Sequence, residues 1–257
     1  MRIDLYLSEN ALAKSRSFAR ILIEEGYVTV NGRVVKKPSF DVTDNDSVVV
    51  TGKPYSFVSR GGVKLLEALR EFNISVNGKR AVDIGASSGG FTDCLLQNGA
   101  VKVYAIDSGS GQLDESLLHD DRVVNIENFN ARNLTLDDIG ERCDIAVTDV
   151  SFISQTLIIP SVVNVLTDGG IFVSLIKPQF ECGKSGLGKG GIVKDKKVMA
   201  EAVKRVISCA AENGLGCKGI VRSPILGGDG NTEFLMMCIL GEKNAVTENE
   251  LRKVVGI

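Results

Sequence analysis

The sequence predicts an α/β protein in which a small N-terminal α+β domain precedes a mostly parallel, seven-stranded sheet. Three observations predict this fold. Beyond position 79, short β-prone runs alternate with helical stretches, as in a doubly wound parallel sheet. The first of these runs ends in a glycine-rich turn, whereas the first fifty residues have the order helix–helix–hairpin. Gly and Pro at 52–56 indicate a boundary, so we expect domains at 1–58, linker included, and at 59–257.

The composition excludes several classes of protein. With 257 residues and 44% hydrophobic residues, the chain can bury the core of one ordinary domain and one small domain. No run reaches the ~18 apolar residues of a membrane span, and no signal-peptide pattern begins the chain, so a soluble cytoplasmic protein is expected. The closest two of the six cysteines, Cys209 and Cys217, are eight positions apart, and His119 is the single histidine. We therefore expect buried thiols and no metal site.

The N-terminal domain is expected to start with two short helices between Met1 and Gly26. Their apolar faces are predicted to consist of Leu5, Leu7 and Leu12, and of Phe18, Ile21 and Leu22. Two β-prone runs, 27–30 and 33–35, flank Asn31-Gly32, a pair that accepts the positive φ angles of a tight hairpin. Another short strand is expected within 41–50.

This order, with Arg2-Ile-Asp-Leu5, Gly26-Tyr-Val28 and Val30-Asn-Gly-Arg-Val34, resembles the small RNA-binding module first known from ribosomal protein S-four. The resemblance implies a basic surface that contacts the RNA backbone, where cations add affinity more than sequence choice. The RNA-binding candidates, with Arg60 added from the start of the second domain, are Arg2, Lys14, Arg16, Arg20, Lys36, Lys37 and Arg60. Charge alone would favour ordinary solvated helix faces, because the net charge is −2.

The second domain is expected to form its sheet from seven runs separated by helices. The strands are predicted at Arg80–Ile84, Val101–Ile106, Arg122–Ile126, Cys143–Thr148, Gly170–Ile176, Gly219–Val221 and Glu233–Leu240. The helices between them include Phe91–Asn98, Leu157–Leu166 and roughly Val198–Asn213.

The turn after the first strand, Asp83-Ile-Gly-Ala-Ser-Ser-Gly-Gly-Phe91, indicates a cofactor site. It is not the dinucleotide fingerprint, because Ser87 stands where that pattern needs its second glycine. S-adenosylmethionine carries an ammonium and a sulfonium instead of a pyrophosphate, which suits an acid at the strand end. Asp107, 24 positions after Asp83, ends the second strand, where a carboxylate can accept the ribose hydroxyls. The cofactor-binding candidates from this turn and strand end are Asp83, Gly85, Ser87, Gly89, Gly90, Phe91 and Asp107.

A second glycine-rich stretch, Gly183–Gly190, comes close to the phosphate-binding loop pattern. It fails at Gly190, where that loop needs a Ser or Thr to hold magnesium. Two interpretations stay open: a basic loop that closes over RNA beside the active site, and a plain flexible loop.

Four charged residues stand where neutral ones would be less costly to bury: Lys64, Asp149, Lys177 and Glu233. The carboxyl ends of parallel strands face one crevice, so Asp149, Lys177 and Asp83 are expected to share it. Each charge alone is more often a surface charge or a capped strand end. Together they indicate a reactive site, because buried charges are costly unless they pair.

The strings around these residues, from Ser59-Arg-Gly-Gly-Val-Lys-Leu65 through Asp149-Val-Ser-Phe152 and Lys177-Pro-Gln-Phe-Glu181 to Gly230-Asn-Thr-Glu-Phe-Leu235, resemble the hemolysin A (TlyA) family. Members combine the S-four-type module with a Rossmann-like, class I methyltransferase domain similar to FtsJ. The resemblance implies S-adenosylmethionine-dependent 2′-O-methylation of cytidine in ribosomal RNA, on ribosomal subunits. It makes Lys64, Asp149, Lys177 and Glu233 the catalytic tetrad and adds Glu127 and Asn128 to the cofactor pocket.

Two alternatives from other classes remain: a non-catalytic RNA-binding or ribosome-assembly protein, and a hemolysin. The intact tetrad argues against the first, and the lack of an amphipathic insertion segment argues against the second. Arg2, interpreted as part of the first helix, favours the shorter family members, which modify large-subunit RNA. Monomer and dimer stay open.

In the mechanism that the residue chemistry suggests, the 2′-hydroxyl attacks the methyl group in line with the sulfonium. Lys177 is expected to orient the hydroxyl and to help remove its proton, while Asp149 and Glu233 hold the two lysines. The sequence leaves open which group takes the proton. Restriction to RNA is expected because DNA lacks the 2′-hydroxyl.

Overall fold

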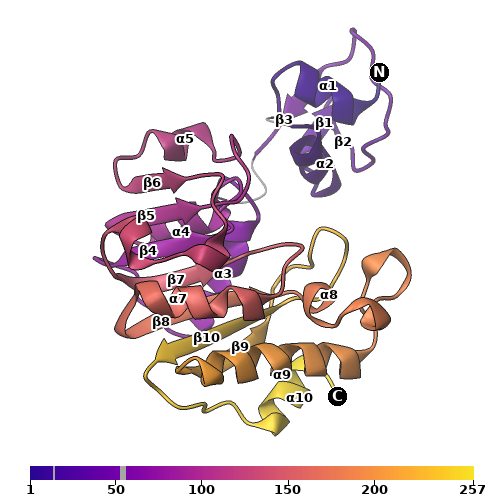
Figure 1. Ribbon diagram of the computed structural model, residues 1–257. Helices are drawn as coiled ribbons and strands as arrows, with labels where there is room; N and C mark the ends of the chain where they lie inside the picture. Colours follow the sequence, from indigo (N-terminus) through magenta and orange to yellow (C-terminus); the bar gives the residue numbers. More distant parts are fainter. Residues whose placement is uncertain (14, 53–55) are drawn as a thin grey trace. The chain divides into compact units, whose positions relative to one another are not determined.

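The computed structural model describes residues 1–13, 15–52 and 56–257. The chain divides into two compact units, Met1–Ser56 and Phe57–Ile257, and each has its own core (Figure 1). Within the described ranges, every helix is too short or too polar to span a lipid bilayer. The linker expected at 52–56 lies mostly outside the described residues.

The N-terminal unit packs two helices on a three-stranded antiparallel sheet of order β2-β1-β3. Its elements are α1 Ile3–Glu9, α2 Arg16–Glu24, β1 Val28–Val30, β2 Arg33–Val34 and β3 Val48–Val50. The hairpin is confirmed: Asn31 and Gly32 join β1 to β2 with φ angles of 51° and 77°. The short strand expected within 41–50 is confined to Val48–Val50, because a turn at 44–46 precedes it.

The predicted apolar face of α1 was partly wrong. Ile3 and Leu7, one helical turn apart, are fully buried, whereas Leu5 is half-buried and Leu12 is 40% exposed. Leu12 cannot belong to that face because α1 ends at Glu9. Arg2 precedes the helix and forms an isolated β-bridge with Asp41, so it was wrongly assigned to the helix.

The C-terminal unit contains a seven-stranded sheet of order β6-β5-β4-β7-β8-β10-β9, which confirms the predicted fold class. Its strands are β4 Arg80–Ile84, β5 Lys102–Ile106, β6 Val123–Ile126, β7 Cys143–Thr148, β8 Leu166–Ile176, β9 Leu215–Arg222 and β10 Phe234–Leu240. Five strands are parallel, and β10 runs antiparallel to both β8 and β9. The chain moves outward from β4 in both directions, so β4 and β7 lie at the switch point, where such sheets bind ligands.

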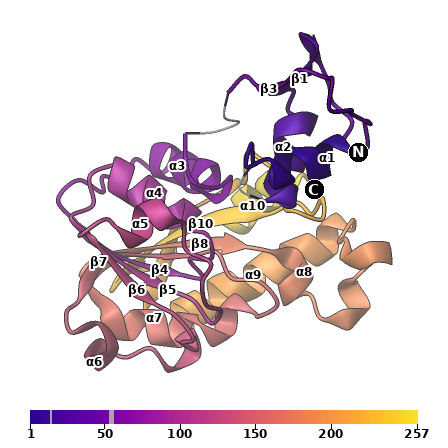
Figure 2. The same ribbon diagram turned by 90° about the horizontal axis from the view of Figure 1, so that it is seen from above.

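Helices cover both faces of this sheet (Figure 2). One face carries α3 Gly61–Glu71, α4 Gly90–Gln97 and α5 Glu115–Leu118; the other carries α7 Ile159–Val165, α9 Lys196–Glu212 and α10 Glu248–Val255. Short helices α6 Leu136–Ile139 and α8 Pro178–Glu181 and the 3₁₀ turns η1 Ala131–Asn133, η2 Gln155–Leu157, η3 Lys184–Gly186 and η4 Lys189–Gly191 complete the unit. Because side chains alternate along a strand, Val82 packs in one core and Ala81 in the other.

Candidate active site

A cavity of about 400 Å³ lies at the carboxyl ends of β4, β5 and β7. Gly85, Ser87, Asp107, Asp149 and Phe152 are among the residues that line it. This is the size of a small-molecule site, and its place at the switch point of the sheet is the one that the strand order predicts.

Backbone geometry forms one wall of the cavity. Gly85 has φ 84°, and a Cβ atom there would lie 2.9 Å from the Asp149 carbonyl oxygen, so a side chain would strain the turn. Ser87 also has positive φ, and its N–H donates to Asp107 Oδ2 at 2.8 Å. Gly109 N–H donates to Asp107 Oδ1 at 2.8 Å. These two bonds fix the Asp107 carboxylate at the edge of the cavity and leave it further acceptor capacity.

Asp83 lies beneath this wall and is not among the lining residues. It is fully buried, and its Oδ2 accepts a 2.7 Å hydrogen bond from Thr92 Oγ1 of α4. Its Oδ1 has no hydrogen-bond partner within the described chain. Burial raises the pKa of Asp83 from 3.8 to about 7, against the opposing effect of Thr92.

Four other cofactor candidates support the cavity instead of lining it. Gly90 and Phe91 are buried where α4 packs against α3; the nearest atoms to a Cβ at Gly90 would be those of Ser59, Gly62 and Gly61. Glu127 accepts the Gly111 N–H at 2.9 Å on each oxygen, which lowers the pKa of Glu127. Asn128 N–H donates to Gly109 O at 2.9 Å. Glu127 and Asn128 therefore hold the 109–111 loop, while their neighbours Phe129 and Asn130 line the cavity.

Gly89, the remaining turn glycine, caps α4 with φ 89°. A Cβ there would come within 2.8 Å of Leu113 Cδ1 and would also overlap Leu117. Its place indicates helix packing, and it is also outside the set that lines the cavity.

The four charged candidates form two ion pairs at the same end of the sheet. Lys177 Nζ lies 2.6 Å from Asp149 Oδ1 and donates to Ser151 Oγ at 2.8 Å. Lys64 Nζ, from α3, lies 2.5 Å from Glu233 Oε2, and these two residues are only 5% and 3% exposed.

Strand register explains why the two pairs meet. Phe234 of β10 is paired with Ile176 of β8, so Glu233 and Lys177 are the next residues at that strand end. Strand β7, which leads to Asp149, lies on the other side of β8. Three neighbouring strands therefore bring Asp149, Lys177 and Glu233 to the same end of the sheet.

Phe152 is a site residue whose role the sequence did not indicate. It lines the cavity, is 91% exposed and has φ 64°, which is a strained conformation for a bulky side chain. Its ring centroid lies 5.2 Å from that of Phe180 in α8. Its place directly after a strand-end acid and a serine, in Asp149-Val-Ser-Phe152, was the available signal.

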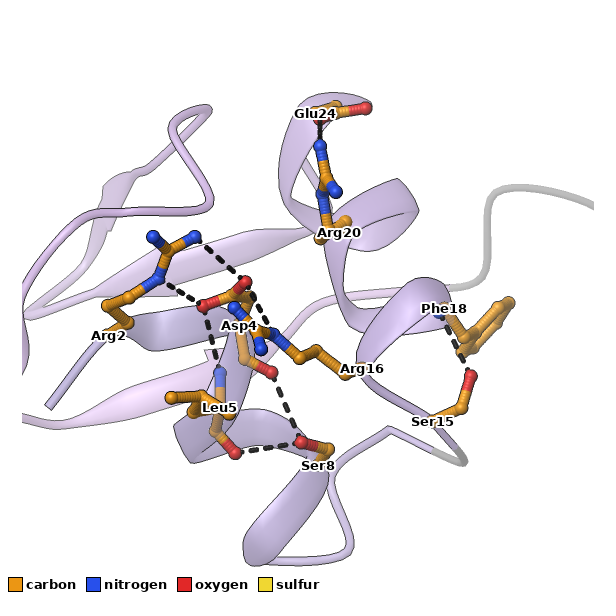
Figure 3. Close-up of polar contacts among 9 residues, drawn as sticks. All are labelled: Arg2, Asp4, Leu5, Ser8, Ser15, Arg16, Phe18, Arg20 and Glu24. Carbon is orange, nitrogen blue, oxygen red and sulfur yellow. Dashed lines mark hydrogen bonds and ion pairs between the residues drawn. The ribbon is translucent and has the colours of Figure 1, made fainter. Parts of the chain in front are cut away.

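Two of the RNA-binding candidates of the N-terminal unit, Arg2 and Arg16, contact a buried acid, Asp4 (Figure 3). Asp4 is fully buried and accepts from Arg2 Nε and from Arg16 Nε, each at 3.0 Å. The Arg2 bond is the main reason that the pKa of Asp4 falls to about 2. Arg20 lies 3.9 Å from Glu24.

The other RNA-binding candidates are dispersed. Lys36 and Lys37 are exposed in the N-terminal unit. Lys14 lies outside the described residues. Arg60 belongs to the C-terminal unit, where it precedes α3 and its guanidinium lies beside Gly228.

The glycine-rich stretch after α8 is attached at its carboxyl end. Asn231, 1% exposed, accepts the Val193 N–H at 2.9 Å and donates to Gly191 O at 3.2 Å. Lys184 and Lys189 on this stretch are exposed. Among the described residues, no group of three or more His, Cys, Asp or Glu side chains is arranged to hold a metal ion.

Comparisons with known proteins agree with this geometry. A family model described as FtsJ-like methyltransferase matches residues 57–238, and one described as S4 domain matches residues 1–48. The 16S/23S rRNA (cytidine-2′-O)-methyltransferase TlyA of Mycobacterium tuberculosis is 44% identical over 236 residues, which are 91% of this chain and 88% of TlyA. YqxC of Bacillus subtilis is 47% identical over 236 residues, 91% of this chain and 84% of YqxC.

A solved structure of a Streptococcus thermophilus protein described as a hemolysin is 39% identical. The match has a TM-score of 0.81 and covers 100% of this chain and 94% of that one. The fold is thus that of a methyltransferase joined to an S4 domain.

Proposed function

We propose that this chain, which belongs to the FtsJ-like methyltransferase family and within it to the TlyA (hemolysin A) group, methylates the ribose 2′-hydroxyl of a cytidine in ribosomal RNA. The names of its relatives support the RNA substrate and the position of the methyl group. An enzyme that acts on ribosomal RNA works in the cytoplasm, where we place this chain.

The observation that carries the proposal is that two ion pairs, Lys177–Asp149 and Lys64–Glu233, lie at the same end of the sheet. Burying charges costs several kcal/mol per ion unless each is paired, and a well-packed apolar set of the same size would often be at least as stable. Lys64 and Glu233 are nevertheless almost fully buried, and Lys177 is 8% exposed. Such a cluster beside a ligand-sized cavity is better explained by chemistry than by stability.

The cavity fits S-adenosylmethionine as the methyl donor. The Asp107 carboxylate, held by two backbone N–H groups, suits the ribose hydroxyls of the donor. The unpartnered Oδ1 of Asp83 is a buried carboxyl oxygen under the turn, and a cationic ligand nearby would favour the ionised form of this acid. When bound, S-adenosylmethionine supplies a methyl group made electrophilic by the sulfonium.

The protein's own groups would position the acceptor. The Lys177 ammonium has three N–H donors. One donates to Ser151 Oγ, and the ammonium is ion-paired with Asp149, so we assign a further donor to the ribose hydroxyl. Glu233 holds Lys64 in the second pair. Phe152, exposed at the cavity rim, offers its ring to the base, because proteins bind unpaired bases by stacking on aromatic side chains. Much of the acceleration would then come from holding hydroxyl and methyl in attack geometry.

Transfer of radiolabelled methyl from S-adenosylmethionine to purified 30S and 50S subunits tests the proposal. We expect label in RNA with the wild type and a loss of at least about 100-fold with Lys177→Ala, since the position of the attacking hydroxyl depends on it. Cofactor affinity of Lys177→Ala should stay within about threefold, because Lys177 is not a lining residue of the cavity. The matched control is Lys243→Ala. Lys243 is exposed and follows the carboxyl end of β10, at the end of the sheet opposite to Lys177.

Either of two results would reject the proposal. Wild-type protein that binds S-adenosylmethionine but labels neither subunit would favour a non-catalytic RNA-binding protein. Loss of cofactor binding in Lys177→Ala would assign that lysine a structural role.

A further inference from the structure

Glu181 is a buried acid that the proposed mechanism does not use. It ends α8, four residues after Lys177, and is only 2% exposed. Burial raises the pKa of Glu181. A carboxylate in such a place is costly unless its acceptors are satisfied, so its partners indicate what it does.

Both partners of this carboxylate belong to the segment that follows β7. Ser154 Oγ donates to Glu181 Oε2 at 2.5 Å, and Gln155 N–H donates to Glu181 Oε1 at 2.7 Å. The main-chain oxygen of Glu181 accepts from the Arg205 guanidinium of α9. Glu181 therefore joins the segment after Asp149 to α8 and, through its backbone, to α9.

Gln155 extends this connection into the sheet. Its side chain is 2% exposed, accepts from Thr148 Oγ1 at 3.0 Å and donates to Leu175 O at 3.1 Å. Thr148 ends β7 directly before Asp149, and Leu175 lies near the end of β8, two residues before Lys177. The carboxyl end of the segment 149–155 is thus fixed to the same two strands that carry the Asp149–Lys177 ion pair.

Between its fixed ends, this segment carries the groups that meet the acceptor in the proposed function. Asp149 N–H donates to Ile84 O at 3.1 Å and fixes the first end. Ser151 accepts from Lys177, and Phe152 stands exposed with φ 64°. A bulky residue keeps such a conformation only where the surrounding contacts impose it. From the α8 side, this conformation can be imposed by the Phe180 ring, which packs against Phe152, and by the two hydrogen bonds that Glu181 accepts from Ser154 and Gln155.

We infer that Glu181 is a positioning residue for methyl transfer, which fixes the segment Asp149–Gln155 so that Ser151 and Phe152 stay in register with Lys177. The inference rests on the proposed function. Glu181 touches neither the cavity lining nor the two ion pairs, so it acts through the segment that it holds.

Two substitutions of nearly equal size separate hydrogen bonding from packing. Glu181→Gln keeps an amide oxygen for Gln155 N–H, and the Ser154 hydroxyl can turn to accept from the amide nitrogen. Glu181→Met keeps the length of the side chain but leaves the buried Gln155 N–H without an acceptor. Ser154→Ala removes one of the two bonds and leaves Glu181 in place, which serves if Glu181→Met does not fold.

Kinetics give the first measurement. We expect kcat on ribosomal subunits to fall roughly 10- to 100-fold in Glu181→Met, since small displacements of positioning groups have effects of this size. Glu181→Gln should stay within about threefold of the wild type, and Ser154→Ala should lie between the two. The Kd for S-adenosylmethionine should change less than about twofold in all three variants, because none of these side chains lines the cavity. Equal losses in Glu181→Gln and Glu181→Met would overturn the inference.

The second measurement does not depend on activity. The chain contains no tryptophan, so Phe152→Trp introduces a single tryptophan on the segment, which can be excited selectively over the four tyrosines. We expect added Glu181→Met, and not added Glu181→Gln, to lower its fluorescence anisotropy and to speed hydrogen exchange of the Gln155 amide. Unchanged anisotropy and exchange in Glu181→Met would reject the positioning role even if the wild type proved inactive. If Glu181→Met changed anisotropy and exchange as expected but the wild type transferred no methyl group, only the proposed function would be rejected.

Discussion

At the scale of single residues, the buried acids of the two units differ in how their charge is balanced. Asp4 has two arginine partners, and its pKa falls to about 2. Asp83 accepts from Thr92 and has no arginine or lysine partner among the described residues, and its pKa rises to about 7. The N-terminal acid is therefore a structural anion that organises cations around it. The acid beneath the glycine turn has no cationic partner among the described residues, which agrees with the proposal that a cationic ligand binds nearby.

We predict that Asp83 makes the C-terminal unit less stable as the pH rises from about 4 to 7. Its folded-state pKa lies above the unfolded value of 3.8, so in this window the folded chain keeps a proton that the unfolded chain has lost. The free energy of unfolding then falls with rising pH and levels above about 7. Asp83→Asn lacks this titration and should gain stability relative to the wild type across the window, while losing cofactor affinity.

Urea unfolding between pH 4.5 and 8.5, with both proteins free of ligand, measures this difference. Asp120→Asn is the control: the pKa of Asp120 is lowered by Arg122, so its titration ends below the window. Parallel pH profiles for Asp83→Asn and the wild type would show that Asp83 is not held protonated.

At the scale of elements, the sequence predicted strand bounds best for strands that are buried on both faces of the sheet. The ranges expected for β4 and β7, Arg80–Ile84 and Cys143–Thr148, are those of the structure. Strand β8 begins four residues before the expected Gly170, because Leu166 already pairs with Cys143 of β7. Local pattern cannot show such pairing, since the partner is distant along the chain.

The same limit applies to the site. The sequence indicated that Lys64, Asp149, Lys177 and Glu233 belong together, because three charges stood at expected strand ends and Lys64 followed a Gly-Gly pair; their catalytic roles remain a proposal. Phe152 and Glu181 could not be assigned roles. The first depends on a backbone angle, and the second on partners 26 and 27 positions away. Periodicity contains neither kind of information.

The glycine-rich stretch between α8 and α9 gives a prediction at this scale. Asn231→Ala leaves the Val193 N–H buried without an acceptor, which should cost about 1–3 kcal/mol and release the stretch. Trypsin should then cleave after Lys184 and Lys189 faster than in the wild type, and methylation should decline if the stretch contacts RNA. Limited proteolysis with mass spectrometry identifies the cleavage sites.

A matched control is Asn244→Ala, which removes the acceptor of another backbone N–H, that of Cys217, at 2.8 Å. Its stability loss should be similar, without faster cleavage at the two lysines. Equal cleavage in both variants would mean that general destabilisation, and not the Asn231 contact, controls the stretch.

At the scale of the whole molecule, each unit has its own hydrophobic core, and the proposed tasks divide between them. The four proposed catalytic residues belong to the C-terminal unit, whereas six of the seven RNA-binding candidates belong to the N-terminal one. Removing Arg2 or Arg16 is a poor test of RNA binding, because each change leaves the buried Asp4 short of a partner. Lys36 and Lys37, both exposed, can be changed without that cost.

We predict that the double variant Lys36→Gln, Lys37→Gln weakens RNA binding without impairing chemistry. If both lysines contact phosphates, the slope of log Kd against log salt should fall by about 1.5 to 2. Each phosphate contact that is lost means that fewer counterions are released when the protein binds. The KM for ribosomal subunits should rise, and kcat at saturating substrate should match the wild type. The control is the double variant Lys79→Gln, Lys243→Gln, which removes the same charge at the other end of the sheet from the strand-end site. It should alter neither the slope nor KM. A reduced kcat at saturation would mean that the N-terminal unit also positions the acceptor, so that affinity and chemistry are not separable between the two units.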